Sequence, residues 1–494
     1  MSKTFFEPYK DSPYYKGKMD IWYLFACNGL DLLNPNGVLC FIATNNWTTS
    51  FGASKLRDKV IKETRICNIV DFGAVMMFES ASIQTMIMMF QKDKIADDYT
   101  FDYRRLTAYK ATEKEAIAIL EPSYNTYEQA ECYTPTIRRA NFYDKNITFS
   151  QSSDILEEML KLPNVIYLND TEIAQGIVPN PDVVNSRNIK SIPDDEIISN
   201  DIKVGDGVFV VDHNYFSYLG QCEKQYIKEL YEPTNCHRYY LDNKVVKDII
   251  YITKNNYKED APFILQHLWK YRFIMEQRRE NQTGRLNYYH LHWPREESYF
   301  RKSEKILVPR KSSSPIFTYA NKATYVMMAI NIIQTNRVNL RFLTGLLNSK
   351  LIEFWLKNKG KMQGANYQLD KEPLQQIPIA VPSNDVQEIV AKLVDMIILL
   401  NTTDERASEL VQNSYISSEL EKLIDGCIYE IYLPSEMAGM SVITVLRNYI
   451  KQNDSICIND IWELYMKIDS TGIIESLNSL SLSSSETLRT IILS

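Results

Sequence analysis

Residues 69–90, IVDFGAVMMFESASIQTMIMMF, contain two apolar runs joined by a short link. The first run predicts a β-strand over Ile66–Phe72, and the second predicts a strand over Ser82–Phe90. The link carries two methionines and Phe78, whereas connections between strands are normally polar. Large apolar side chains at this place indicate either core packing or one wall of a binding site.

The residues before this stretch alternate between helix and strand signals. Met19–Leu33 has apolar residues at helical spacing, and residues 38–44, VLCFIAT, form a short apolar run typical of a buried parallel strand. Ser54–Lys62 predicts a second helix. The order helix, strand, helix, strand, strand predicts an α/β layer. Because so apolar a strand is normally paired on both edges, residues 1–95 predict only part of a doubly wound sheet.

Three further segments follow along the chain. We expect residues 96–150 to be a connecting extension. Residues 151–383 are rich in Tyr, Asn and Pro and in short alternating runs, which predicts a largely β or α+β domain. Helical spacing returns in residues 384–494, for example in DVQEIVAKLVDMIILL. The expected fold class is therefore α/β and α+β, with C-terminal helices.

Composition sets the broad class of protein. The chain has 494 residues, of which 45% are hydrophobic and 24% charged, and this is typical of a globular chain with about three domains. Its eight cysteines form no Cys-x-x-Cys pair, so neither a zinc ribbon nor a disulfide framework is predicted. No leader and no apolar run of membrane-spanning length is evident, so we expect a cytoplasmic protein without membrane contact.

Three motifs resemble, in order and spacing, the later motifs of adenine-specific DNA methyltransferases of the amino-methylating class. They are MDIWYLF (19–25), LLNPNGVLCFIATNNWTTSFGASKLR (32–57) and residues 69–90. The chain looks most like the fused enzymes of type IIG restriction-modification systems. The resemblance implies that residues 1–95 are the C-terminal part of a Rossmann-like methyltransferase sheet.

Later segments resemble the TaqI-like C-terminal specificity domain. They include GIVPNPDVVN (176–185), TGRLNYYHLHWPR (283–295), KILVPRKSS (305–313) and the stretch 342–379 with its Leu-Asn-Ser-Lys helix. The resemblance implies that residues 151–383 are a target-recognition domain whose partner is double-stranded DNA.

Two motifs of this family do not occur in the sequence. It contains neither the Gly-rich Phe-x-Gly-x-Gly loop for S-adenosylmethionine nor Asn-Pro-Pro-Tyr. The adenine amine is a poor nucleophile, and in the family the Asn side chain and a carbonyl accept its hydrogens during transfer. We therefore expect S-adenosylmethionine to be used only when an upstream methyltransferase polypeptide supplies these motifs, and the chain alone to be inactive. The alternative is a DNA-binding specificity module or a decayed fragment without catalytic activity.

The resemblance also implies a role for the apolar link. Such enzymes flip the target adenine out of the duplex, and the family places its stacking aromatic after Asp-Phe-Gly, where this sequence has Phe78. The alternative is that Phe78 packs in the core, as we expect for Met76 and Met77. Asn45 follows the 38–44 strand at its carboxyl end, where open α/β sheets bind ligands, but it equally suits a turn.

One region is clearly basic although the net charge is −7. Residues 270–311 hold eleven Lys and Arg against five Glu, interleaved with aromatic residues. Guanidinium groups suit phosphates and guanine edges, so the region predicts DNA contacts, with a solvated, ion-paired face as the alternative. The predicted contacts are Arg272, Arg278, Arg279, Arg285, Arg295, Arg301, Arg310 and Lys311.

A second basic stretch follows the Leu-Asn-Ser-Lys helix. Lys357, Lys359 and Lys361 lie around Gly360, which predicts a flexible loop facing DNA or an ordinary surface loop. His290 and His292 alternate on a predicted strand, but no third ligand stands nearby, so no metal site is predicted.

Overall fold

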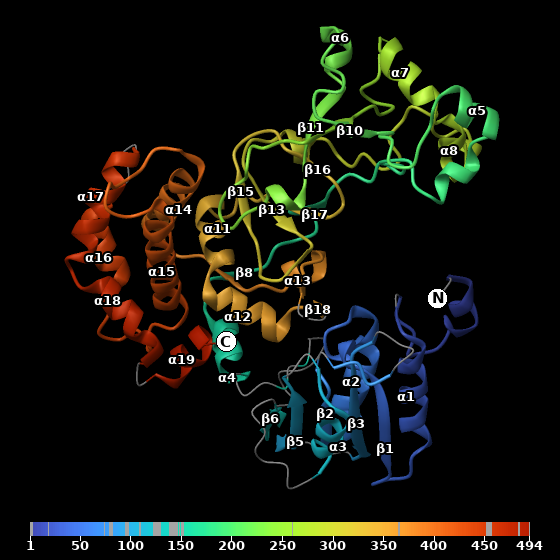
Figure 1. Cartoon of the computed structure of the whole chain (residues 1–494). Helices are drawn as coiled ribbons and strands as arrows, with labels where there is room; N and C mark the ends of the chain where they lie inside the picture. Colours follow the sequence, from blue (N-terminus) through green and yellow to red (C-terminus); the bar gives the residue numbers. More distant parts are fainter. Residues whose placement is uncertain are drawn as a thin grey trace. The chain divides into compact units, whose positions relative to one another are not determined.

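The chain forms two compact units in its computed structural model (Figure 1). Residues 1–161 and 354–368 make up the first unit, and residues 162–353 and 369–494 make up the second. The structure describes residues 3–17, 19–73, 75–78, 83–93, 98–107, 110–121, 130–137, 147, 149, 153–258, 260–363, 366–450, 457–482 and 485–493.

A five-stranded sheet is the centre of the first unit. Its order is β1-β3-β2-β5-β6, and the strands are β1 (Val38–Thr44), β2 (Thr64–Asp71), β3 (Thr85–Lys92), β5 (Asp102–Leu106) and β6 (Ala130–Tyr133). Strand β3 is antiparallel to both β1 and β2, so these two strands run in the same direction. Strand β5 continues parallel to β2, and β6 is antiparallel to β5.

Helices pack beside this sheet in the order that the sequence predicts. Helices α1 (Ile21–Leu32) and α2 (Ser54–Glu63) precede and follow β1 in the chain, and their apolar sides join the sheet in one core around Trp47, Val60 and Phe90. The other elements of this unit are η1 (Lys3–Tyr9), η2 (Asn45–Thr48), η3 (Phe51–Ala53), β4 (Tyr99–Thr100), α3 (Glu113–Ala118), β7 (Thr136–Ile137), α4 (Ser153–Lys161), β18 (Met362–Gln363) and β19 (Asn366–Gln368).

Two expectations for this unit need correction. Strand β1 is not a buried parallel strand: within the described residues it pairs only with β3, in antiparallel register, and its alternate residues are exposed. Val38 is 47% exposed and Ile42 is 48% exposed. The stretch after residue 95 is more than a connection, since β5 and β6 extend the same sheet.

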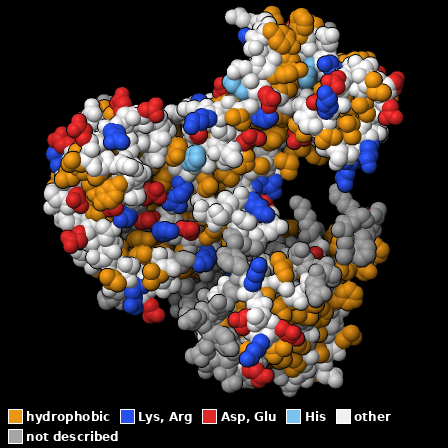
Figure 2. Space-filling model, in the orientation of Figure 1, with side chains coloured by type: hydrophobic (Ala, Val, Ile, Leu, Met, Phe, Trp, Pro, Cys, Tyr) orange, Lys and Arg blue, Asp and Glu red, His pale blue; other side chains and the backbone are white. Residues whose placement is uncertain are grey.

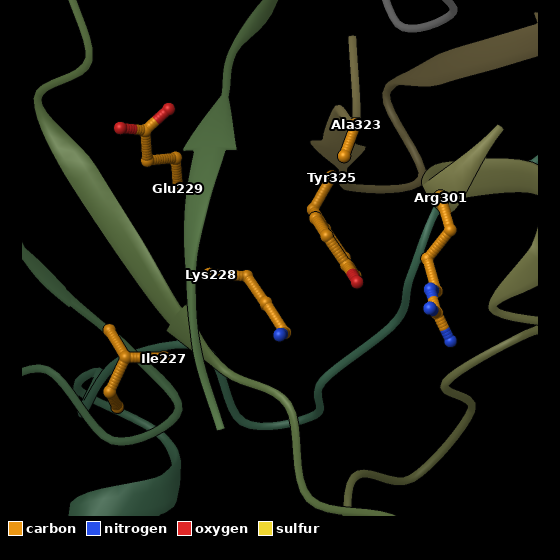
Figure 3. Close-up of a pocket in the computed structure, with 6 residues that line it drawn as sticks. All are labelled: Ile227, Lys228, Glu229, Arg301, Ala323 and Tyr325. Carbon is orange, nitrogen blue, oxygen red and sulfur yellow. The ribbon is translucent and has the colours of Figure 1, made fainter. Parts of the chain in front are cut away.

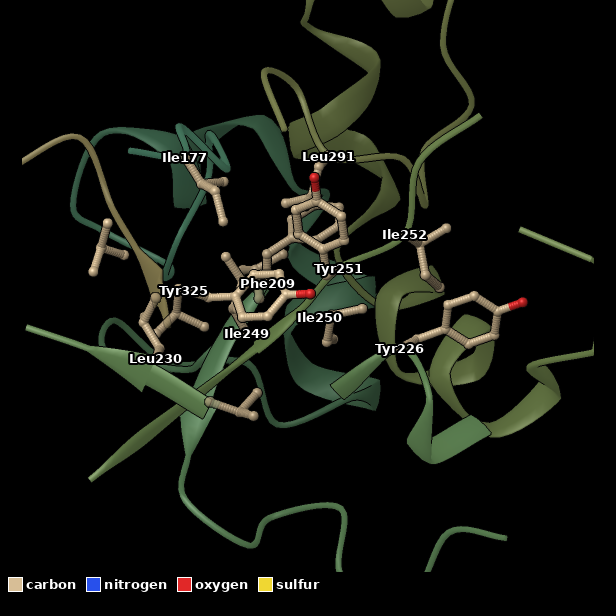
Figure 4. Packing of buried hydrophobic residues seen from close by; sticks show 14 of the residues in the cluster. Ile177, Phe209, Tyr226, Leu230, Ile249, Ile250, Tyr251, Ile252, Leu291 and Tyr325 are labelled. Carbon is tan, nitrogen blue, oxygen red and sulfur yellow. The ribbon is translucent and has the colours of Figure 1, made fainter. Parts of the chain in front are cut away.

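Two four-stranded sheets form the body of the second unit. One has the order β10-β12-β11-β16, with β10 (Val210–Asp212), β11 (Ile227–Tyr231), β12 (Lys247–Ile250) and β16 (Tyr325–Val326). The other has the order β15-β13-β17-β9, with β9 (Ile173–Gln175), β13 (Lys305–Pro309), β15 (Thr318–Ala320) and β17 (Ile330–Ile333). Side chains from both sheets share one hydrophobic cluster, part of which appears in Figure 4.

Short elements decorate these sheets. They are β8 (Val165–Ile166), η5 (Asn188–Ser191), α5 (Asp194–Ser199), α6 (Gln221–Lys224), η6 (Pro233–Asn235), α7 (Pro262–Trp269), α8 (Arg272–Glu276), α9 (Arg279–Gln282), α10 (Ser298–Arg301), β14 (Lys311–Ser312), α13 (Lys371–Gln375) and β20 (Ile379–Ala380). Helix α12 (Lys350–Lys359) crosses the boundary between the two units.

The predicted C-terminal helices are confirmed. The longest are α14 (Asn384–Thr402) and α15 (Asn413–Tyr432), which pack with α11 (Leu340–Asn348). Gly345 lets α11 approach α14 closely, because a Cβ added at Gly345 would lie 2.8 Å from Val390 Cγ1. The remaining helices are α16 (Val442–Tyr449), α17 (Ile458–Asp469), α18 (Ile473–Asn478), η7 (Ser479–Leu482) and α19 (Glu486–Leu493). Among the described residues, no helix has both the length and the apolar character needed to cross a membrane.

The buried histidines of the second unit predict acid sensitivity. The Nε2–H of His267 in α7 donates to the Val208 carbonyl at 3.1 Å, and burial lowers the pKa of His267 to about 4. The unfolded chain, with a histidine pKa near 6.5, therefore binds more protons between about pH 6.5 and 4. We expect the free energy of unfolding to fall across this window, measured by urea unfolding. His267→Gln should flatten the decline, and an unchanged slope would contradict the assignment.

Candidate functional site

The carboxyl ends of β1 and β2 lie at the same edge of the first sheet. Their last residues flank the beginning of β3, because Thr44 pairs with Thr85 and Asp71 pairs with Met86. Just beyond β1, Asn45 reaches across this point, and its Nδ2 donates to Asp71 Oδ1 at 3.1 Å. One hydrogen bond thus joins the ends of two strands that are not neighbours in the sheet.

Asp71 organises this edge. Its carboxylate is only 6% exposed and accepts hydrogen bonds from the Gly73 amide at 2.9 Å and the Tyr103 hydroxyl at 3.3 Å, in addition to Asn45. Arg105 Nε lies 4.0 Å from Asp71 Oδ2. A buried carboxylate is stable only when such donors replace water. Asp71 therefore has a structural role at the start of the link.

Gly73 determines how the chain leaves β2. Its φ is +58°, a region that favours glycine, and a Cβ added there would lie 2.2 Å from the Leu106 carbonyl oxygen. Any other residue would clash with the backbone of β5. The link therefore leaves the sheet in one direction, which positions the residues after it.

The link residues alternate between buried and exposed positions. Val75 is buried, and Met77 packs against the small cluster that contains Val75 and Phe72. Met76 is 50% exposed and Phe78 is 44% exposed. The expected core packing is thus confirmed for Met77 and wrong for Met76, because successive residues face opposite sides. With 44% of its surface exposed, Phe78 is unlike a core residue.

Polar groups of α1 and η2 continue this edge beyond β1. Trp22 Nε1 donates to Thr44 Oγ1 at 3.1 Å, and the Tyr23 hydroxyl donates to Asn46 Oδ1 at 3.3 Å. Burial raises the pKa of Tyr23 to about 12, so its hydroxyl keeps its proton at neutral pH. Asn45 begins the η2 turn, as the turn alternative predicts, and its amide donates to Asp71; its contact with a ligand stays a prediction.

The structure divides the predicted DNA-contacting arginines into two groups. Arg278 is buried, and its guanidinium donates to the carbonyls of His290 and Pro179, so it is a structural residue. Three others are held by protein acceptors: Arg272 by Glu196, Arg295 by Gln175 and the Gly176 carbonyl, and Arg310 by Asp370.

The second group is exposed. Within the described residues, no hydrogen bond or ion pair holds the side chains of Arg279, Arg285, Arg301 or Lys311. Lys357 and Lys359 lie in the last turn of α12, and Lys361 immediately precedes β18. The alternation of buried and exposed arginines within one short stretch has no signal in the sequence.

The two predicted strand histidines have separate partners. His290 Nδ1 accepts from the Asn287 amide at 3.0 Å, and His292 Nε2 lies 2.8 Å from Glu280 Oε2. No group of three or more potential metal ligands occurs in the part of the chain that the structure describes.

Two family models match the chain. Residues 1–78 match the Eco57I restriction-modification methylase family, and residues 224–379 match the TaqI-like C-terminal specificity domain. The predicted resemblance to restriction-modification methyltransferases is confirmed. The methylase match ends at Phe78, and the specificity match contains the whole basic stretch at residues 270–311. The two matches lie in different parts of the chain, so residues 1–78 are similar to a restriction-modification methylase and residues 224–379 to a specificity domain.

Solved structures of two restriction-modification enzymes match the chain, and the first of them, with a TM-score above 0.5, shows a similar fold. The type IIL restriction-modification enzyme MmeI in complex with DNA is 14% identical, with a TM-score of 0.52, over 92% of this chain and 54% of that chain. The type IIG restriction endonuclease BpuSI is 12% identical, with a TM-score of 0.30, over 85% of this chain and 50% of that chain. This chain therefore spans about half the length of these structures. Curated protein sequences contain no match to it.

The described residues at the sheet edge do not fit S-adenosylmethionine, the cofactor that a methylase family implies. The buried carboxylate of Asp71 already accepts from Asn45, Gly73 and Tyr103, so it is used within the protein and is not directed at a ribose. No step of methyl transfer is assigned to these residues.

Removal of the Asp71 carboxylate should destabilise the first unit. Asp71→Ala leaves two buried donors, Gly73 and Tyr103, and the half-buried Asn45 amide without an acceptor, so we expect the free energy of unfolding to fall by about 2–4 kcal/mol. Asp11→Ala, at an exposed position of the same unit, is the matched control and should change it by less than about 0.5 kcal/mol. Equal effects of the two substitutions in urea unfolding would contradict this role.

Proposed function

We propose that this chain is the DNA-recognition and base-holding component of an adenine-specific DNA methyltransferase of the type IIG restriction-modification class. Phe78 stacks on the flipped adenine, and a partner methyltransferase polypeptide supplies S-adenosylmethionine and the Asn-Pro-Pro-Tyr loop. The observation that carries the proposal is the half-exposed Phe78 ring, which follows a rigid Gly73 turn at the carboxyl edge of a methylase-like sheet.

The chemistry of this chain's own residues is binding and orientation. An adenine outside the duplex loses its stacking neighbours, and an aromatic ring replaces them while excluding water from one face of the base. The hydrogen bond from Asn45 and the turn at Gly73 keep the base of the link from moving. When bound, S-adenosylmethionine supplies the electrophilic methyl group. In this proposal the partner polypeptide orients the adenine amine.

The open side of β1 supports a partner that adds to the sheet. Within the described residues, one edge of β1 has no paired strand, and Val38 and Ile42 expose apolar side chains. Hydrophobic side chains also gather on this part of the first unit in Figure 2. Phe25 and Leu32 of α1 are exposed as well. An unpaired apolar strand readily accepts another strand. We assign this side of the sheet to the methyltransferase partner.

Exposed and half-buried cations supply the DNA contacts in this proposal. Arg279, Arg285, Arg301 and Lys311 extend from the specificity segment, and Lys357, Lys359 and Lys361 extend from α12 and the residues after it. Phosphate contacts of this kind set affinity and register, while base edges determine specificity. Arg278 is left out because its guanidinium is buried.

The chain by itself should not bind S-adenosylmethionine. The reason is that the sequence lacks the Gly-rich loop and that the Asp71 carboxylate is occupied by protein donors. Calorimetric titration of S-adenosylmethionine into the purified chain should show no heat of binding. Micromolar binding with one site per chain would contradict the proposal that the partner polypeptide binds S-adenosylmethionine.

Phe78→Ala should impair base retention more than folding. In the complex with the methyltransferase partner, we expect roughly a tenfold or greater loss of methylation and of the fluorescence rise of 2-aminopurine at the target position, because stacking contributes about 1–3 kcal/mol per base. Phe78→Trp should retain both signals. Met76→Ala, at an equally exposed position of the link, is the matched control. A large loss of stability with unchanged activity per folded molecule would favour core packing instead.

A DNA-binding module without methylation is the second candidate, and the specificity match at residues 224–379 favours it. Both candidates predict DNA binding by the chain. The two candidates differ in what the first unit does. A methyltransferase component needs a partner polypeptide on β1, whereas a DNA-binding module does not. Val38→Lys and Ile42→Lys should abolish co-purification with the methyltransferase polypeptide and leave DNA binding unchanged. If no such polypeptide associates with the unsubstituted chain, the binding module is the correct function.

A further inference from the structure

A pocket of about 480 Å³ lies in the second unit between β11, the start of β16 and α10. Its lining residues are Ile227, Lys228, Glu229, Arg301, Ala323 and Tyr325 (Figure 3). Arg301 belongs to the predicted DNA contacts, whereas nothing in the sequence distinguished Lys228. The pocket lies within the segment that matches the TaqI-like specificity domain.

Three side chains of this pocket point in the same direction. In Figure 3, the Lys228 ammonium, the Arg301 guanidinium and the Tyr325 hydroxyl are directed to the same side, and Lys228 Nζ lies 5.7 Å from the centroid of the Tyr325 ring. The Glu229 carboxylate points away, as expected for the next residue of a strand, and it accepts from the Tyr231 hydroxyl at 2.9 Å. The strand thus separates its acidic side chain from the cations.

The two cations have no anionic partner. Among the described residues, neither Lys228 nor Arg301 forms an ion pair or donates a side-chain hydrogen bond. Burial lowers the pKa of Lys228; the Glu297 carboxylate raises it, and the Arg301 guanidinium lowers it again. Two cations that repel each other in a partly dry pocket are stabilised by a bound anion.

The charge of the pocket matches a single negative charge. The Glu297 carboxylate raises the pKa of Lys228, and its Oε1 accepts from the Tyr325 hydroxyl at 2.8 Å. With the Glu229 carboxylate directed away from the cations, Lys228, Arg301 and Glu297 together carry one net positive charge. A phosphodiester, which carries one negative charge, neutralises this set, whereas a phosphate monoester brings nearly two.

The wall of the pocket is rigid. The Tyr325 ring stacks on Phe300, with centroids 5.4 Å apart and an interplanar angle of 19°, and it meets the Tyr251 ring edge-on at 5.3 Å. Leu230 of β11 pairs in parallel with Tyr325, which holds the strand that carries Lys228 beside the ring. The positions of the Lys228 and Tyr325 backbones are therefore set before a ligand arrives.

We propose that the pocket of Lys228, Arg301 and Tyr325 binds one backbone phosphodiester of duplex DNA. The assignment rests on the proposed DNA recognition and adds to it a built phosphate site that combines the planar Arg301 fork with the Lys228 point charge. Because a phosphate contact carries no sequence information, its loss weakens binding equally for all DNA sequences.

The test is fluorescence anisotropy of the full chain with two duplexes of unrelated sequence, over a range of salt concentrations. Lys228→Gln and Arg301→Gln should each raise Kd roughly tenfold on both duplexes. Each should also reduce the slope of log K against log salt by about 0.9, since one phosphate contact is lost. The double variant should lose no more slope than either single variant, because both side chains hold the same phosphate.

Lys203→Gln is the matched control. Lys203 is an exposed lysine of the same unit in an ion pair with Asp201 at 2.8 Å, so its substitution changes the net charge equally and should leave Kd within about twofold. Unchanged binding by Lys228→Gln, or additive loss of slope in the double variant, would overturn the shared phosphate site. Failure of the unsubstituted chain to bind either duplex would overturn DNA recognition itself.

A calorimetric titration with inorganic phosphate separates the two sources of the ligand. The proposal requires weak binding of free phosphate, with no saturation at concentrations where the duplex is fully bound. Tight binding of inorganic phosphate that disappears in Lys228→Gln would assign the pocket to a free phosphate instead of the DNA backbone.

Discussion

Strand β3 lies between β1 and β2 and is antiparallel to both, and the candidate site depends on this arrangement. It brings the carboxyl ends of two strands to one edge, close enough for Asn45 to donate to Asp71. The same carboxylate holds the Gly73 amide, and Gly73 cannot take a side chain because β5 lies against it. The order of the strands therefore determines the hydrogen bonds of Asp71 and the turn at Gly73. The exposed Phe78 lies in the link that follows this turn.

Burial of polar groups explains why the basic stretch is only in part a surface. The Arg278 guanidinium lies against the Phe209 ring and is buried. It donates to the carbonyls of His290 and Pro179, which would otherwise be bonded to water. Arg301, 23 residues later, is exposed at the end of a short helix. Net charge and local charge density do not tell a buried arginine such as Arg278 from an exposed one such as Arg301. An arginine is buried where the fold leaves backbone carbonyls without other donors.

The unequal covering of the first sheet has an energetic consequence. Alternate side chains of β1 face solvent although the strand is strongly apolar, and each half-exposed Val or Ile forgoes about half of the roughly 1.5–3 kcal/mol that complete burial contributes. Strands β2 and β3, by contrast, contribute to a closed core with α1 and α2. This difference within one sheet is the physical reason for placing a partner beside β1, and the specificity segment needs no such completion because its two sheets share one core.

The sequence by itself determined the succession of elements in residues 21–92, the C-terminal helices and the place of the apolar link, because hydrophobic periodicity and glycine are local signals. It also placed Phe78 in the link after Asp-Phe-Gly, where the family resemblance predicts a stacking ring. Only the tertiary structure decided that β1 is an exposed strand, that Arg278 is internal and that Lys228 faces Arg301 across a pocket. Strand pairing, burial and the approach of two charged side chains all involve segments that are far apart in the chain. A local sequence pattern does not show which distant segments come together.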